Sequence, residues 1–396
     1  MMNRVTRRVS GLAAVAAVLA VAATGVVGAT RAQTSDAPVV VPLVGKLSAP
    51  AGFTVEVYAA GVRAARQLTV APSGTVFVGA MGLGSKGTFA VNALVDRDKD
   101  HKVDAVIPVA AGLDTPNGVA FYKGALYVAE MHRIIRFDDV EAHLGQPQMP
   151  TVVIDGLPGT AMHGWKTIRF GPDGKLYVTI GAPCNVCEVK PDEPRTASIA
   201  RMNPDGSQFE MVVRGVRNSV GLAWHPATKE LWYTNNGRDM LGDDVPPDTL
   251  NRVTRAGQDF GFPYCHAGEI ADPEFGQKQP CASFTPPARK LGAHVAALGL
   301  AFYTGKMFPE AYRNQVFIAE HGSWNRSKKT GYRVSLVRLD AKGNAVGYEP
   351  FLQGGSKGRR TGAVPPMWPC WLTARSWSRT TRRTRSTGSA TGSSRV

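Results

Sequence analysis

The sequence predicts an all-β protein, a six-bladed β-propeller whose last blade is incomplete or disordered in this chain. Three observations lead to this prediction. Similar short units recur through the middle of the chain, each unit joins two apolar strands by a turn rich in Pro, Asp or Gly, and long helical periodicity is absent. Blades of short strands around a central channel are the architecture that such repetition favours.

Five units of the same form follow one another, each with an apolar strand, a turn and an alternating strand that ends in small or polar residues. Their starts are 51, 49, 54 and 78 residues apart, and outer strands are expected after several of them. A β-sandwich or a pair of small β domains would leave the repeat unexplained. The units are Leu68–Met81, Val119–Met131, Ile168–Gly181, Leu222–Asn236 and Leu300–Gly322.

The net charge of +15 belongs to the two ends of the chain. Residues 1–32 contain four Arg and no acidic residue, and residues 356–396 contain nine Lys or Arg and no acidic residue. Residues 33–355 hold 33 of the 46 basic residues and all 31 acidic ones, so their net charge is only +2. The charge therefore gives no reason to expect a nucleic acid as partner.

Residues 1–32 are predicted to be a signal peptide, because basic residues precede an apolar run over residues 9–28 and small residues follow at Ala29 and Ala32. Residues 6–9 match a twin-arginine signal loosely. The alternative is a transmembrane anchor, but the Ala-rich run favours a segment that is removed. We expect a periplasmic or secreted protein without a stable membrane span after signal removal.

Four cysteines lie in the body of the chain, and an exported protein is expected to form disulfides from them. Four cysteines allow three pairings. We favour Cys184 with Cys187 and Cys265 with Cys281, because each pair is close in sequence. Zinc binding lacks a second Cys or His pair of suitable spacing, and Glu188 stands where a c-type haem site would need His.

The propeller domain is assigned to residues 33–355, and an aberrant basic tail to residues 356–396. The simpler interpretation of the tail is a disordered basic segment. The sharper one is a frameshift, because a one-base change of frame lets the codons of residues 366–391 encode DVAVLADGSLLVSDDAADAIYRISY, which has the form of another unit. We expect this chain to express poorly or to be inactive without that last blade.

His163 lies just before the third unit and is the candidate general base, because an imidazole titrates near neutral pH. Arg217 and Asn218 lie in the equivalent place before the fourth unit. A guanidinium suits developing negative charge or a bound carboxylate. The alternatives are a structural histidine and a surface arginine that caps loop carbonyls. The competing histidines are His132, His225, His294 and His321.

Two segments are candidates for calcium. The carbonyls of Gly261, Phe262 and Pro263 could serve as ligands, although a plain turn is the simpler interpretation. The second segment is spaced like an EF-hand loop, but His101 and Ile107 replace its Gly and Glu, which favours a solvated charged turn. Its carboxylates belong to Asp96, Asp98, Asp100 and Asp104.

Residues 321–326 follow the fifth unit and offer the aromatic face of Trp324 and the cation of Arg326. Both groups suit a planar anionic ligand. The alternative is that the tryptophan only packs against its neighbours.

Taken in order, residues 41–355 resemble the PQQ-dependent sugar dehydrogenases of the soluble glucose dehydrogenase and L-sorbosone dehydrogenase type. The stretches that carry the resemblance are HGWKTIRFGPDGKLYVTIGAPCNVC, VRNSVGLAWHP, AGQDFGFPYC and FIAEHGSWNRS. The sorbosone-type branch is the more similar. The resemblance implies a six-bladed propeller that binds pyrroloquinoline quinone (PQQ) and Ca²⁺ over its channel.

The resemblance also implies the roles of single residues. His163 matches the base, Arg217 the cation at the quinone oxygen, and Asn218 a cofactor contact. The segment 261–263 matches the calcium loop, and Arg326 lies near a contact to the PQQ carboxylates.

The sequence departs from this family at three places. The acid that orients the base in glucose dehydrogenases is replaced by Ala182. A Gln contact is replaced near Pro116, with Asn117 as the substitute. A late Arg falls in residues 362–366, where only the shifted frame restores it.

The sequence leaves three candidate functions. The first is an exported quinoprotein oxidoreductase that acts on a small sugar or a sugar-derived aldehyde or alcohol, with an unknown electron acceptor. The second is a calcium-dependent, lactonase-like hydrolase, which the basic and amidic character of the channel residues disfavours. The third is a non-catalytic propeller that binds a ligand or partner.

Overall fold

The computed structural model describes residues 47–81, 88–160 and 162–354. The predicted signal peptide at 1–32 and the basic tail at 356–396 lie outside the described residues, and both assignments remain predictions. No helix in the described ranges is long and apolar enough to cross a membrane.

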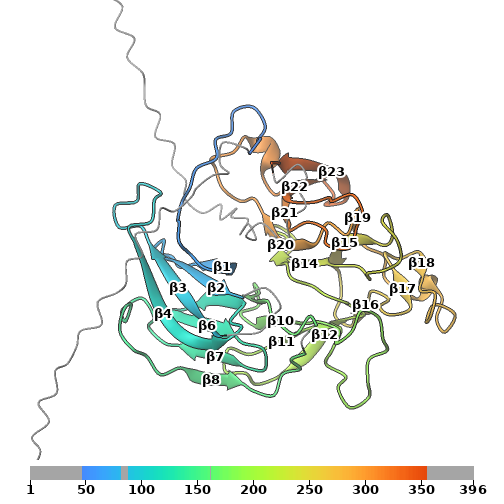
Figure 1. Cartoon of the computed structure of the whole chain (residues 1–396), viewed down its shortest axis with the longest axis horizontal. Coiled ribbons are helices and arrows are strands. Elements are labelled where there is room, and N and C mark those ends of the chain that lie inside the picture. The colour runs from blue at the N-terminus through green and yellow to red at the C-terminus, as the bar shows by residue number, and fades with distance from the viewer. Residues whose placement is uncertain (1–46, 82–87, 161, 355–396) are drawn as a thin grey trace, which may run out of the picture. The chain divides into compact units, whose positions relative to one another are not determined.

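The described chain is all-β, as the sequence predicted, with only two short 3₁₀ turns, η2 (Cys281–Ser283) and η3 (Glu310–Tyr312). Its five large sheets follow one another in chain order (Figure 1). The first consists of β1 (Ala65–Val70), β2 (Val76–Ala80), β3 (Thr88–Val95) and β4 (Ala105–Asp114), and the second of β5 (Gly118–Tyr122), β6 (Ala125–Ala129), β7 (Ile134–Phe137) and β8 (Thr151–Ile154). The third consists of β9 (Ile168–Phe170), β10 (Leu176–Ile180), β11 (Ser198–Met202), β12 (Glu210–Arg214) and the parallel β16 (Gln258–Asp259).

The fourth sheet consists of β13 (Leu222–Trp224), β14 (Leu231–Asn235), β15 (Pro247–Val253) and β19 (Arg289–Ala293). The fifth consists of β20 (Ala297–Phe302), β21 (Val316–Glu320), β22 (Arg333–Leu339) and β23 (Ala345–Leu352). A separate two-stranded ladder, β17 (Cys265–His266) with β18 (Ile270–Ala271), is formed by the chain between β15 and β19.

The third unit shows how the local sequence makes a blade hairpin. The apolar residues of β10 are all buried and pair in antiparallel register with β9. Between the two strands, Asp173 accepts a hydrogen bond from the N–H of Lys175, and Gly174 has φ +73°. That backbone conformation favours glycine, so the Pro-Asp-Gly turn fixes the register of the hairpin.

The first strands of the five sheets lie side by side, in the order β1, β5, β9, β13 and β20. Side chains join them across the centre: the Gln67 amide bonds to the backbone of Ile168, and Arg169 donates to the carbonyls of Leu222 and Leu300. Between neighbouring sheets the apolar faces pack together, as Ala120 and Tyr127 of the second sheet do against Ile168 of the third. This arrangement is a propeller, as predicted.

Among the described strands, β20 and β1 lack the close contact that joins the other neighbouring first strands. The N-terminal segment lies between the two sheets instead. Ser48 pairs with Gln353 just after β23, and the carbonyl of Tyr58 accepts a hydrogen bond from Val103 beside the first sheet. A sixth blade remains a prediction.

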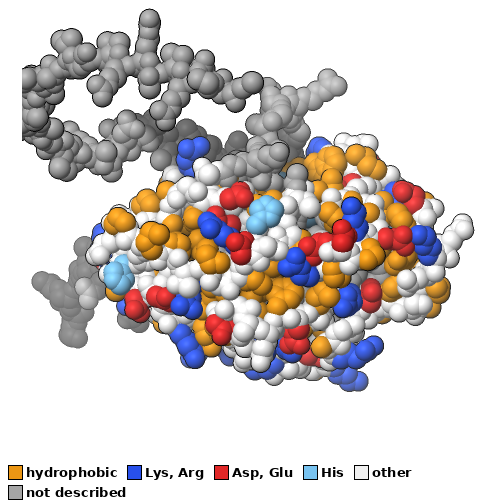
Figure 2. Space-filling model, turned by 90° about the horizontal axis from the view of Figure 1, so that it is seen from below, with side chains coloured by type: hydrophobic (Ala, Val, Ile, Leu, Met, Phe, Trp, Pro, Cys, Tyr) orange, Lys and Arg blue, Asp and Glu red, His pale blue; other side chains and the backbone are white. Residues whose placement is uncertain are grey.

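Charges are mixed on the face shown in Figure 2, where Lys and Arg side chains alternate with Asp and Glu. No patch of one sign covers that face. This distribution agrees with the small net charge of residues 33–355.

Phe53 anchors the N-terminal segment to the fifth sheet, because its ring makes edge contacts with Phe308, Tyr312 and Phe351 at 4.8–5.3 Å between centroids. We expect Phe53→Ala to lower the free energy of unfolding by about 2 kcal/mol, through lost apolar burial and ring contacts. Urea unfolding measures the change. Val57, which is 37% exposed, provides the control: Val57→Ala should cost less than about 0.5 kcal/mol. Equal losses in both variants would show that Phe53 is no anchor.

Candidate functional site

His163 lies in the loop between β8 and β9 and is only 7% exposed. Its backbone is left-handed, with φ +55°. The main chain and Cβ of His163 lie against Gly181, where an added Cβ would be 2.5 Å from the Cβ and 2.6 Å from the carbonyl oxygen of His163. A glycine is therefore required after β10 to let the His163 loop approach.

The tautomer of His163 follows from its hydrogen bond. Nδ1 lies 2.9 Å from the carbonyl oxygen of Ala182, and a carbonyl can only accept, so Nδ1 carries the proton. Nε2 has no hydrogen-bond partner among the described residues. Burial and, second, the charge of Arg217 lower the pKa of His163 to about 3, against the opposing effect of the Ala182 carbonyl. The imidazole is therefore neutral at physiological pH, with its lone pair on Nε2.

Arg217 follows β12 and is 3% exposed, so it is not a surface arginine. Its Nε donates to the Asn185 carbonyl at 2.8 Å, and its Nη2 donates to Asn185 Oδ1 at 2.8 Å and to Asp239 Oδ2 at 2.9 Å. Nη1 has only one long contact, 3.5 Å to the carbonyl of Asn236. Burial lowers the pKa of Arg217 and Asp239 opposes this effect, but a guanidinium stays charged at neutral pH.

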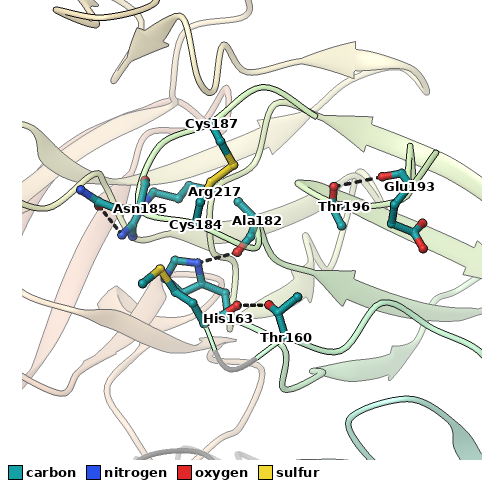
Figure 3. Close-up of a disulfide and its surroundings, with 10 residues drawn as sticks. Thr160, His163, Ala182, Cys184, Asn185, Cys187, Glu193, Thr196 and Arg217 are labelled. Atoms are coloured by element: carbon teal, nitrogen blue, oxygen red, sulfur yellow. Dashed lines mark hydrogen bonds between the residues drawn. A yellow bond between two sulfur atoms is a disulfide. The ribbon is translucent and has the colours of Figure 1, made fainter. Parts of the chain in front are cut away.

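The structure brings the predicted base and cation together, and Figure 3 shows how. Ala182 lies between them: its N–H donates to the carbonyl of Arg217 at 2.8 Å, and its own carbonyl accepts the Nδ1–H of His163 at 2.9 Å. A backbone carbonyl thus takes the place of the acidic side chain whose absence the sequence showed.

The two predicted asparagines differ in their surroundings. Asn218 is 8% exposed, and its backbone pairs with Asn235 and Asn236 while its side-chain amide has no hydrogen bond among the described residues. Asn117 is 3% exposed and donates from Nδ2 to the carbonyl of Lys166 at 2.7 Å. Asn117 therefore supports the His163 loop from the neighbouring blade.

Trp324 and Arg326 lie on a separate feature, an open hollow of about 500 Å³ beside the loop of residues 239–244. Trp324 is 66% exposed. Arg326 donates to the carbonyl of Asp243 and pairs with Asp244 at 2.8 Å. The hollow is linked to the site through Asn325, which bonds to Asp239 at 3.4 Å.

The segment 261–263 approaches Arg217 but is poorly suited to a cation there. The Gly261 carbonyl accepts the N–H of Cys265 at 2.8 Å. Phe262 borders a cavity of about 20 Å³ that Arg217 and Arg238 also line, while no carboxylate lines it. Two guanidinium groups disfavour a bound cation. The calcium assignment to Gly261, Phe262 and Pro263 remains a prediction.

The acidic loop between β3 and β4 brings together three of the four predicted carboxylates. Oxygen atoms of Asp96, Asp98 and Asp104 lie within 4.8 Å of one another. Asp100 does not join this group and accepts the N–H of Lys102 instead. Backbone N–H groups of the loop also bond to the clustered carboxylates, which is what a charged turn needs without any metal.

Both predicted disulfides are present, Cys184–Cys187 and Cys265–Cys281.

The competing histidines have other partners. His132 lies by the Leu157 carbonyl, His225 accepts N–H groups in its own turn, and His294 lies by the Gly242 carbonyl. The imidazole of His321 is close enough to Arg66 for that charge to lower its pKa, after burial.

Sequence reasoning missed three residues of the site. Asn185 lies between the cysteines of the first disulfide, and Asp239 follows β14 in the position where other blades supply site residues. Lys166 is fully buried, donates from Nζ to the carbonyls of Pro158 and Gly164, and has its pKa lowered by burial to about 7. The only sequence feature that could have identified one of them is the position of Asp239 just after a blade strand.

Comparison with known proteins places the chain among characterised folds. The sequence profile described as TrAA12-like matches residues 47–350. An uncharacterized protein of Borreliella burgdorferi is 33% identical over 325 residues, 79% of this chain and 82% of that protein.

Three solved structures share the fold. The iodide structure of the Trichoderma reesei family AA12 enzyme has a TM-score of 0.66 at 19% identity, over 77% of this chain and 87% of that one. The holo PQQ domain of Coprinopsis cinerea pyranose dehydrogenase has 0.66 at 18%, over 80% and 88%. The PQQ-bound aldose sugar dehydrogenase of Streptomyces coelicolor has 0.54 at 19%, over 77% and 84%.

We expect His163 to remain neutral down to about pH 4, with the proton on Nδ1. Because its pKa of about 3 in the folded protein is below 6.5, its contribution to stability is complete above pH 6.5 and is lost as the pH falls towards 3. ¹⁵N NMR of the imidazole and urea unfolding at pH 7 and pH 4.5 measure both effects. The loss between these pH values should be smaller in His163→Gln than in the parent or in His143→Gln, which alters an exposed histidine. An imidazole at position 163 that titrates near pH 6.5 would contradict the assignment.

Proposed function

The chain belongs to the TrAA12-like family, and we propose that it is an exported quinoprotein oxidoreductase that oxidises a sugar or a sugar-derived aldehyde or alcohol with PQQ. The observation that carries the proposal is the buried pair of a neutral imidazole and a guanidinium, His163 and Arg217, on successive blades. The fold shared with two PQQ-containing sugar dehydrogenase structures supports it.

His163 is proposed as the group that accepts the proton of the substrate hydroxyl. Its Nδ1–H is held by the Ala182 carbonyl, so Nε2 is the atom that can accept a proton. Removal of that proton raises the electron density on the substrate carbon and favours the departure of its C–H hydrogen as hydride, so that loss of the proton and the hydride leaves a carbonyl group.

PQQ, when bound, would supply the two-electron acceptor. The residues present fit such an anionic group. Nη1 of Arg217 is the least engaged atom of a buried guanidinium, and the amide of Asn218 has no partner among the described residues. Arg217 would hold negative charge on the cofactor, because charge stabilisation is strong in a buried site. Trp324 and Arg326 are proposed as further contacts from the hollow beside it.

At the segment 261–263, calcium is proposed together with PQQ and not by itself. The Gly261 carbonyl already accepts a hydrogen bond, and two guanidinium groups line the cavity beside Phe262, so the negative charge that a cation requires would come from the carboxylates of PQQ. The acidic loop with Asp96, Asp98 and Asp104 is a second candidate for a structural calcium ion.

A lactonase-like hydrolase is the second candidate function. Such an enzyme needs carboxylate and amide side chains that converge on a calcium ion in the channel. Within the described site, Asp239 is paired with Arg217, and Asp248 accepts backbone N–H groups of Gly237 and Ala296. Their engagement favours the oxidoreductase.

Purified protein with the restored reading frame should reduce an artificial electron acceptor when Ca²⁺, PQQ and aldoses are added. His163→Ala should lower kcat/KM by about 10²–10⁴-fold and leave PQQ binding intact, because only proton transfer is lost. Arg217→Ala should weaken PQQ binding as well as turnover. His143→Ala and Arg313→Ala alter exposed groups and serve as controls. Lactone hydrolysis without PQQ, or PQQ binding that none of the variants changes, would overturn the proposal.

The altered C-terminal segment gives a separate prediction. We propose that residues 356–396 replace a sixth blade through a frameshift, and that the chain with the restored frame expresses better and has a higher Tm. An additional blade would cover the apolar faces and strand edges beside the first and fifth sheets. Resequencing of the gene and parallel expression of both forms measure this. An unbroken reading frame, with soluble active protein from the printed chain, would refute it.

A further inference from the structure

The loop after β10, residues 181–187, touches both members of the candidate site. We call it the cystine turn, because the Cys184–Cys187 disulfide closes it. Its first residues carry the backbone link between His163 and Arg217 described above. Its central residue, Asn185, faces the guanidinium of Arg217 (Figure 3).

The backbone carbonyl, Oδ1 and Nδ2 of Asn185 all form hydrogen bonds with Arg217 or Asp239. Its carbonyl accepts Nε–H of Arg217 at 2.8 Å, and its Oδ1 accepts from Nη2 of the same arginine at 2.8 Å. Oδ1 also accepts the backbone N–H of Asp239 at 2.9 Å, and Nδ2 donates to the Asp239 carbonyl at 3.1 Å. Asn185 therefore spans the ion pair between Arg217 and Asp239.

This contact decides which edge of the guanidinium is free. The planar fork of an arginine fixes the angles between its N–H groups. Because Asn185 and Asp239 occupy Nε and Nη2, Nη1 is left with the long contact to Asn236. Without Asn185, the guanidinium could rotate, because the attraction of Asp239 would no longer be opposed.

The cystine turn is also braced from outside. Phe262 packs against Ala182, Cys184 and Val186. Just after the turn, Glu188 accepts hydrogen bonds from the Tyr264 hydroxyl at 2.9 Å and from Lys278 at 2.7 Å. The disulfide is the covalent part of this support.

We propose that Asn185, held by the Cys184–Cys187 disulfide, is the positioning residue of Arg217. It keeps Nη1 directed away from Asp239 and available to a bound anion. The inference rests on the proposed function only where it calls Arg217 a site residue. It also makes the site sensitive to thiol reductants, because opening of the disulfide frees the turn while the fold of the strands remains.

The test reads the guanidinium directly in the protein without cofactor. The Nε–H and Nη2–H signals of Arg217 are assigned by their loss in Arg217→Lys, and their exchange with water is measured by NMR. We expect Asn185→Ala to speed the exchange at Nη2 by about tenfold, because the variant removes the Oδ1 acceptor of Nη2 and keeps the backbone carbonyl that accepts Nε–H. Asn185→Asp retains the acceptor oxygen and should remain close to the parent. Asn203→Ala removes an asparagine from the β11–β12 turn on the same sheet and is the matched control.

The pKa of His163 is the second readout, because the charge of Arg217 lowers it. If the guanidinium moves away in Asn185→Ala, the pKa of His163 should rise by about one unit. The other charged groups near Arg217, Asp248 and Arg238, are unchanged in that variant.

The disulfide is tested in parallel. Cys184→Ser with Cys187→Ser should speed the exchange of the Arg217 Nη2–H as Asn185→Ala does, and Cys265→Ser with Cys281→Ser should not. This pair decides the question if Asn185→Ala does not fold. Unchanged exchange in folded variants of either kind overturns the inference. If the Arg217 N–H groups exchange faster in the variants but the protein binds no PQQ, the proposed function is wrong and the inference about Asn185 still holds.

Discussion

The central constraint on this structure is the burial of a guanidinium beside an imidazole. Arg217 and His163 are 3% and 7% exposed, so water would solvate a positive charge on either side chain poorly. The cation therefore needs a carboxylate, and Asp239 supplies it at 2.9 Å. The imidazole then has to remain neutral, which burial and the neighbouring charge enforce. Each loop around the pair can be understood as meeting one of these requirements.

The propeller fold meets the requirements because it places the ends of successive blades side by side. The second strands of the sheets, such as β2, β6 and β10, bury their side chains, and the first strands lie side by side, so the loops before and after them converge. The left-handed backbone of His163 and the glycine at position 181 then let the imidazole reach the next loop. The strands are thus generic, while the site depends on a few backbone conformations.

The sequence was sufficient to predict the features that follow from side-chain pattern. Alternating apolar strands and Pro-Asp-Gly turns predicted the five sheets, and short spacing predicted both disulfides. The pairing of His163 with Arg217 followed from their equivalent places in consecutive units. Backbone atoms leave no such pattern, so the Ala182 carbonyl could not be foreseen as the group that orients His163. Asn185 was missed because its role arises from the chain reversal that the disulfide imposes.

A carbonyl in place of a carboxylate changes the proton affinity of the His163 imidazole. A carboxylate beside Nδ1 would raise the pKa of His163, while the neutral Ala182 carbonyl raises it only weakly against burial and Arg217. A base with a pKa of about 3 accepts a proton poorly while the positive charge of Arg217 faces it. An anionic ligand on Nη1 of Arg217 would neutralise that charge and raise the pKa of His163. In the proposed function, anion binding and the basicity of His163 would therefore be coupled through one guanidinium, which gives a physical reason for holding it as firmly as Asn185 and Asp239 do.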